Sequence, residues 1–240
     1  MADLLCQRDE PLKLCDMFTK RKLIKSKCPG VFRKSIFTTI LALFAVSISY
    51  AQKQSVGETH VYVAKINAIN PQLTNSKVSG EAIFIEANGK LKITMVVKGL
   101  SPGMHLGHIH GFVSDKASTC PPSNADTNGD GIVDLIETEP YAGTTLIPFN
   151  GDPVGLKIKS DTYPVADKNG VLTYEMTVSL DKLDAAIKKA YRINKLSLEN
   201  RVIFIHGVPE GKSLPGSAKS LPGVPAYVTV PIACGEIRAL

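Results

Sequence analysis

Short segments in which apolar and polar residues alternate recur along this chain, and they limit its fold more than any other feature. In an extended strand, successive side chains point to opposite faces, so an alternating segment buries one face and exposes the other. The segments are rich in β-branched residues and are separated by Gly, Pro and Asn. They span residues 60–66, 77–86, 90–98, 105–113, 171–178, 201–206 and 226–233. This spacing predicts an all-β fold, an antiparallel sandwich or barrel.

Two local signals add detail to this prediction. Asn88-Gly89 joins two of the segments, and this dipeptide favours the positive φ angles of a tight hairpin turn. Residues 181–191 instead repeat their apolar side chains at helical spacing, with Asp181 as a candidate N-cap. We therefore expect one short helix packed on the β domain.

The positive charge of the chain is concentrated at its N-terminus. Residues 1–51 hold nine Lys and Arg and four Asp and Glu, a balance of +5, whereas residues 52–240 hold nineteen and eighteen, a balance of +1. The basic residues precede an apolar run from Ile36 to Ala51 that ends in small residues. This order predicts a secretory signal peptide cleaved before Gln52. A membrane anchor is the alternative, but the run is shorter than the roughly 20 residues that span a bilayer.

The chain is thus predicted to consist of a leader, residues 1–51, and one domain, residues 52–240. The nearly neutral domain predicts no nucleic-acid partner and, after cleavage, no membrane partner. Cleavage leaves Cys120 and Cys234 as the two cysteines of the mature chain. In a secreted or periplasmic protein such a pair predicts one disulfide, the alternative being two unpaired buried thiols.

His108 and His110 alternate within the segment 105–113, so they share one face of the predicted strand. Two imidazoles at this spacing suit copper or zinc. The alternative is a pair of exposed or core-edge histidines, because the pattern is short.

Motifs in the domain occur in the order found in one known family. They are KGLSPGMH at 98–105, HIH at 108–110, Cys120, VIFIH at 202–206 and ACGEI at 233–237. Together they resemble the copper-zinc superoxide dismutase family over most of residues 52–240. The resemblance implies a Greek-key β-sandwich and a role for each matching residue. The implied roles are copper ligation by His108, His110 and His206, a disulfide between Cys120 and Cys234, loop fastening by His105, and orientation of a ligating imidazole by Glu210.

The chain also departs from the family pattern. Asp126 stands where the family has its metal-bridging histidine, and Pro231 stands where the family has an arginine that attracts superoxide. No histidine occurs between His110 and His206, so zinc binding of the family type is not expected. Two functions remain open: an exported copper protein that dismutates superoxide, or a non-catalytic calcium- and copper-binding structural or interaction module.

A twelve-residue acidic loop stands in place of the zinc ligands. It matches the EF-hand calcium pattern, with oxygen donors at loop positions 1, 3, 5, 7, 9 and 12 and glycine at position 6. The expected ligands are Asp126, Asn128, Asp130, the Ile132 carbonyl, Asp134 and Glu137. The alternative is a solvated acidic turn. Nearby prolines argue against a helix on both sides of the loop, so we expect a lone calcium-stabilised loop in a β protein.

Overall fold

The computed structural model describes residues 57–74 and 78–240. The predicted signal peptide and its cleavage site before Gln52 lie outside these residues. Within the described part, no helix is both long enough and apolar enough to cross a membrane.

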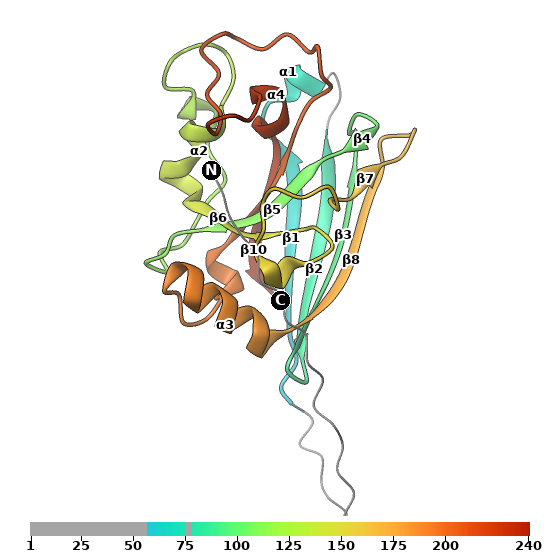
Figure 1. Cartoon of the computed structure of the whole chain (residues 1–240), viewed down its shortest axis with the longest axis vertical. Helices are drawn as coiled ribbons and strands as arrows, with labels where there is room; N and C mark the ends of the chain where they lie inside the picture. The colour runs from blue at the N-terminus through green and yellow to red at the C-terminus, as the bar shows by residue number, and fades with distance from the viewer. Residues whose placement is uncertain (1–56, 75–77) are drawn as a thin grey trace, which may run out of the picture. The chain divides into compact units, whose positions relative to one another are not determined.

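An antiparallel sheet of eight strands forms the body of the domain, in the order β6-β5-β9-β10-β1-β2-β3-β8 (Figure 1). Its strands are β1 (His60–Ala68), β2 (Ser79–Ala87), β3 (Lys90–Lys98), β5 (Leu106–Gly111), β6 (Thr144–Pro148), β8 (Leu172–Ser179), β9 (Val202–His206) and β10 (Pro231–Ala239). Two short strands, β4 (Gly103–Met104) and β7 (Val165–Ala166), pair separately. Because β9 and β10 return to lie between β5 and β1, the connections are of the Greek-key type. The predicted all-β Greek-key fold is confirmed.

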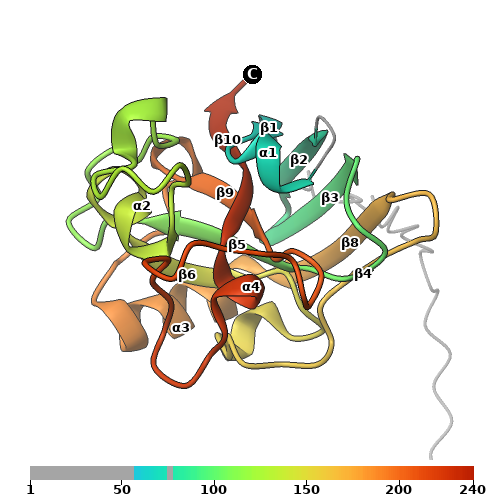
Figure 2. The ribbon, with the colours of Figure 1, turned by 90° about the horizontal axis from the view of Figure 1, so that it is seen from above.

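The sheet is strongly curled, as the view from above shows (Figure 2), and its inner face packs on the main apolar core. Alternate residues of β1, β2 and β3 are buried in that core, as the period-two pattern predicts. The turn between β2 and β3 has positive φ at both Asn88 and Gly89, which confirms the predicted hairpin.

Strands β5 and β9 are buried on both faces. Ile203 and Ile205 of β9 point into the main core, whereas Val202 and Phe204 pack on the other face in a second cluster with Ala142. A covering layer of helix and loop therefore lies over the outer face of these strands, and the three histidines lie on this same face.

The helices of the described residues lie in the connections between strands. They are α1 (Pro71–Thr74), α2 (Leu135–Ala142), α3 (Leu180–Tyr191) and α4 (Ala226–Thr229), with 3-10 turns at Ser123–Ala125, Pro153–Gly155 and Leu198–Asn200. The predicted helix at 181–191 is confirmed as α3, although its N-cap is Ser179 and not Asp181.

One further prediction needs correction, and two elements were not predicted. Residues 226–233 are not one strand, because α4 follows Pro225 and β10 starts only at Pro231. The acidic loop is followed by a helix, α2, which tolerates Pro140 near its C-terminal end. Strand β6 carries no alternating pattern that separates it from a loop, since its last three residues are all buried.

Candidate metal centre

The three predicted copper ligands come from two neighbouring strands. His108 and His110 lie on β5, and His206 is the last residue of β9. The antiparallel register pairs His108 with Phe204 and Leu106 with His206. Since residues two apart in a strand share a face, this register puts all three imidazoles on the same side of the sheet.

The imidazoles converge on one point. One ring nitrogen from each histidine lies within 4.8 Å of the other two. Each residue is only 2–3% exposed. Among the described residues, this is the one group of at least three His, Cys, Asp or Glu side chains that is gathered so closely. The arrangement can hold a metal ion.

Hydrogen bonds define the state of the His108 ring. Its Nε2 lies 2.8 Å from the hydroxyl oxygen of Tyr163, and that hydroxyl donates to the Ile158 carbonyl at 2.9 Å. The Nδ1 atom of His108 is buried and has no hydrogen-bond partner. One nitrogen is therefore fixed by the protein and the other is free to bind a ligand.

The other two histidines repeat this arrangement. His206 donates from Nδ1 to the Thr229 carbonyl at 2.8 Å, and its buried Nε2 has no partner. His110 has Thr145 Oγ1 at 3.2 Å from Nε2, and its buried Nδ1 has no partner. Three of the five unpartnered buried side-chain atoms in the described residues thus belong to this cluster. Buried polar atoms are normally hydrogen-bonded, and a cation held by the cluster could supply the partner that these atoms lack.

Burial also keeps the rings neutral. Desolvation lowers the pKa of His110 to about 3 and that of His206 to about 4. Burial, followed by repulsion from the other two rings, lowers the pKa of His108 well below its ordinary value. A neutral imidazole with one protonated nitrogen presents a lone pair on the other, which is the form that binds metal ions.

A small cavity opens over the histidines. Its volume is about 90 Å³, and its walls include Leu135 and Glu139 of α2, Ile158 and Leu221. A water molecule takes up about 30 Å³ in the liquid, so the cavity admits only very small molecules. Glu139 is exposed, and it is the one charged side chain among the described residues that line the cavity.

His105 is buried beside the centre and fastens two segments. Its Nε2 lies 2.8 Å from the Ser101 carbonyl, and its Nδ1 lies 3.1 Å from the carbonyl of His206. Glu210, by contrast, is exposed. The three rings have hydrogen bonds with Tyr163, Thr145 and Thr229 and with the backbone of Gly143, and the structure gives Glu210 no orienting contact.

Pro231 stands where the family has its arginine. Pro231 is buried, begins β10 and lies opposite His206 in the β9–β10 register. A proline has no charged group, so this position supplies no attraction for an anion.

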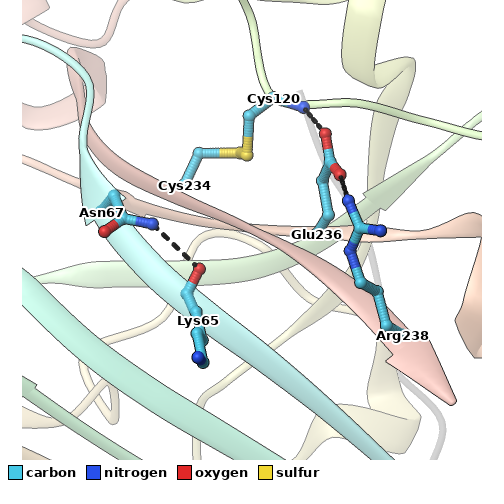
Figure 3. The surroundings of a disulfide bond; sticks show 6 residues. All are labelled: Lys65, Asn67, Cys120, Cys234, Glu236 and Arg238. Carbon is cyan, nitrogen blue, oxygen red and sulfur yellow. Dashed lines mark hydrogen bonds and ion pairs between the residues drawn. A yellow bond between two sulfur atoms is a disulfide. The ribbon is translucent and has the colours of Figure 1, made fainter.

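The predicted disulfide is confirmed. Cys120 and Cys234 are bonded, with their Cα atoms 5.8 Å apart, and the bond ties the segment after β5 to strand β10. Figure 3 shows that Glu236 continues this link, because its carboxylate accepts from the Cys120 backbone N–H and from Arg238. A groove of about 660 Å³ runs beside the disulfide on the outer face of β1 and β10.

The acidic loop has a regular network of hydrogen bonds. Asp126 accepts from the backbone N–H groups of Gly129, Asp130 and Gly131, and Gly131 has the positive φ of +90° expected for loop position 6. Asp134 caps α2 in a capping box with Glu137. The loop thus has the turn that the pattern predicts, and a helix follows it.

Its carboxylates do not converge as the histidines do. Burial favours a higher pKa for Glu137, but hydrogen bonds from Asp134 and Thr127 outweigh it and lower the pKa. A hydrogen bond from Ser217 likewise lowers the pKa of Asp130. Donors from the protein therefore satisfy these oxygens, and the loop carboxylates form no close group of three.

Sequence reasoning missed several residues around the histidines. Tyr163, Thr145 and Thr229 hold the rings, and Glu139 and Leu221 line the cavity. The described contact between Tyr163 and His108 spans 55 positions of sequence. No local pattern signals such a contact, because it depends on the path of the loop between β6 and β7.

No protein-family model matches this chain, and no curated protein matches it. The similarity to the copper-zinc superoxide dismutases is therefore a resemblance of motifs in their order along the chain, and it assigns no family.

Proposed function

We propose that this chain is an exported copper-binding protein of the superoxide dismutase-like type, with one copper ion held by His108, His110 and His206. The observation that carries the proposal is the close group of three buried histidines, in which one ring nitrogen of each lies within 4.8 Å of the other two and every ring has a nitrogen without a hydrogen-bond partner. Leaving such atoms without a partner is costly, and a cation offers each lone pair the partner that it lacks.

The donor set favours copper over other ions. Imidazole nitrogen binds copper and zinc, whereas calcium and magnesium prefer oxygen ligands. For a given nitrogen site, Cu²⁺ binds more strongly than Zn²⁺ or the earlier divalent metals. The resemblance to copper-zinc superoxide dismutases also implies copper at these three positions.

Bound copper would supply one-electron transfer, by which one superoxide is oxidised to O₂ and a second, with two protons, is reduced to H₂O₂. The protein's own residues would position the ion and control access to it. Tyr163 and Thr229 fix the rings of His108 and His206, and the cavity walls restrict entry to very small molecules.

A second function, non-catalytic copper binding, is favoured by the cavity itself. Its charged lining residue is Glu139, and Lys and Arg are absent from the described residues that surround it. Superoxide is an anion, so this lining disfavours its approach, whereas a copper cation is attracted. Copper storage or transfer requires that the ion can reach the histidines, but it does not require that superoxide can reach them.

Export is supported by three features taken together. The basic leader and apolar run resemble a signal peptide, and the disulfide is of the kind that persists in oxidising compartments.

The acidic loop adds a proposed calcium site at Asp126, Asn128, Asp130, Asp134 and Glu137, with the Ile132 carbonyl. Five oxygen-donor side chains in the EF-hand order support calcium and not copper at this place.

Metal analysis of the purified protein tests the copper proposal. Offered copper and zinc together, the wild type should retain one copper per chain, and His206→Gln should lose most of it. His60→Gln is the control, because His60 is exposed and lies outside the cluster. Retention of zinc in preference to copper, or equal copper in both variants, would refute the three-histidine copper site.

A superoxide assay on the same samples separates the two functions. Catalysis predicts that dismutation accompanies copper loading in the wild type and in His60→Gln and disappears in His206→Gln. Stoichiometric copper without dismutation would instead support the non-catalytic function.

A further inference from the structure

Tyr163 lies outside the histidine cluster but contacts it through both its ring and its hydroxyl. It lies in the loop between β6 and β7, only 3% exposed, and its ring meets that of His108 edge-on with 5.4 Å between centroids. Its hydroxyl contacts two groups, the Nε2 atom of His108 at 2.8 Å and the carbonyl of Ile158 at 2.9 Å.

The chemistry of these partners fixes the direction of both hydrogen bonds. A carbonyl oxygen only accepts, so the single hydroxyl hydrogen of Tyr163 goes to Ile158. The hydroxyl oxygen must then accept from His108, which places a hydrogen on Nε2. Because the neutral ring carries one N–H, its Nδ1 is left as a bare lone pair, and this is the atom without a partner.

The loop that carries Tyr163 is itself held in place. On one side, Thr162 accepts from the Gly151 backbone N–H at 3.0 Å. On the other, the Pro164 carbonyl accepts from the backbone N–H of His105 at 3.2 Å. Hydrogen bonds on both sides of Tyr163 therefore hold the loop segment that carries it.

We propose that Tyr163 is the positioning residue of the centre: its hydroxyl, anchored on the Ile158 carbonyl, holds His108 in the Nε2–H tautomer and directs Nδ1 to the metal. This inference rests on the proposed copper site but concerns a property of the metal-free protein as well. It assigns to Tyr163 the orienting role that the family resemblance implied for Glu210. Groups that orient metal-binding histidines typically contribute 10- to 100-fold to metal affinity.

The test compares Tyr163→Phe with Tyr174→Phe. Both changes remove one hydroxyl from a buried tyrosine, but Tyr174 donates to the Asn150 carbonyl and contacts none of the three histidines. Phenylalanine keeps the ring, so both variants should fold, and their melting temperatures check this.

Two readouts are measured on the full exported protein. The first is the ¹⁵N NMR tautomer of each histidine in the metal-free state, and the second is copper affinity by competition with a chromophoric chelator. The wild type and Tyr174→Phe should show His108 protonated on Nε2. Tyr163→Phe should show a mixture of His108 tautomers and bind copper about 10- to 100-fold more weakly.

The outcomes distinguish this inference from the copper proposal. The expected tautomers in a wild type that binds no copper would support the role of Tyr163 and refute the copper site. A wild-type His108 protonated on Nδ1 would overturn the role of Tyr163. So would a Tyr163→Phe variant that matches Tyr174→Phe in both tautomer and affinity.

Discussion

At the scale of single residues, the protein holds the three imidazoles neutral and close together. The centroids of their rings lie 5.2 to 5.8 Å apart, and the rings are almost completely buried. Protonation of any one of them would place a charge in this apolar setting beside its neighbours. The metal-free centre is therefore sensitive to acid.

The stability of the metal-free protein should depend on pH, because the pKa values of the buried histidines are lowered in the folded state. The folded pKa is about 3 for His110 and about 4 for His206, against an ordinary value of 6.5. Between pH 6.5 and about 4, the unfolded chain binds protons that the folded chain does not bind. Stability therefore falls as the pH is lowered through this window, by up to about 1.4 kcal/mol per pH unit for each such histidine.

Urea denaturation of the metal-free protein between pH 7 and pH 4 measures this effect. His206→Gln should flatten the decline relative to the wild type, whereas His60→Gln should leave it unchanged. Equal slopes in all three proteins would show that the buried rings are not the groups that titrate.

The sequence predicted the three histidines because period two and the motif order both depend on local pattern. His108 and His110 share a face in any extended strand, and the resemblance supplied His206. Tyr163 could not be found in this way, since its hydroxyl reaches His108 through the fold of an irregular loop. Glu210 was the sequence-based choice for an orienting group, but the structure leaves it exposed.

At the scale of elements, α2 connects the acidic loop to the histidine cluster. Asp134, the ninth residue of the loop, caps the helix, and Leu135 and Glu139 of the same helix line the cavity over the histidines. The opposite wall is also connected, because Lys219 donates its backbone N–H to Asp134 two residues before Leu221. Order in the acidic loop therefore bears on the shape of the cavity.

Calcium should stabilise the folded protein through this loop. A ligand that binds only the folded state adds RT ln(1 + [L]/Kd), about 2.7 kcal/mol at a hundredfold excess over Kd. Chelation should lower the melting temperature, and Glu137→Gln should remove most of the difference between the calcium-loaded and chelated states. Copper binding at the histidines should survive this change.

The quantity to compare is the difference in melting temperature between the calcium-loaded and the chelated protein. Glu137 also accepts hydrogen bonds from the backbone of Thr127, Asn128 and Asp134. Losing these contacts lowers stability with or without calcium. Asp167→Asn is a suitable control, since Asp167 accepts backbone hydrogen bonds in a separate turn. A chelator that leaves the wild-type melting curve unchanged would rule out the stabilising role.

Element boundaries were predictable where local pattern and packing agree. Residues 90–98 form β3 as predicted, because alternate residues face the core. Residues 226–233 mislead because their apolar side chains occupy a helical turn before the strand begins. Strand β6 lacks an alternating pattern because its last three residues are all buried, and Pro140 obscures helix α2 although Asp134 and Glu137 form a capping box at its start.

At the scale of the whole molecule, one disulfide links two distant parts of the chain. The bond joins cysteines 114 positions apart and brings the segment after β5 against β10, which lies between β9 and β1 in the sheet. In the chain-entropy account, a closed loop of this length destabilises the unfolded state by about 4 to 5 kcal/mol.

Replacing both cysteines, Cys120→Ser with Cys234→Ser, should therefore lower the free energy of unfolding by up to about 4 to 5 kcal/mol. Urea denaturation measures it, and the slope of unfolding free energy against urea should rise because the unfolded chain is less compact. Serine at both positions avoids a reactive single thiol. A loss below about 1 kcal/mol would mean that the bond constrains the unfolded chain little.

The same bond has a consequence for a protein exposed to proteases. The connection at 207–225, between β9 and α4, carries many exposed residues, so it is a natural place for a protease to cut. It lies inside the ring of chain that the disulfide closes. A single cut there opens the ring without dividing the molecule, because Cys234 in the C-terminal fragment remains bonded to Cys120. The nicked chain keeps β9, with His206, and β10 in one covalent piece.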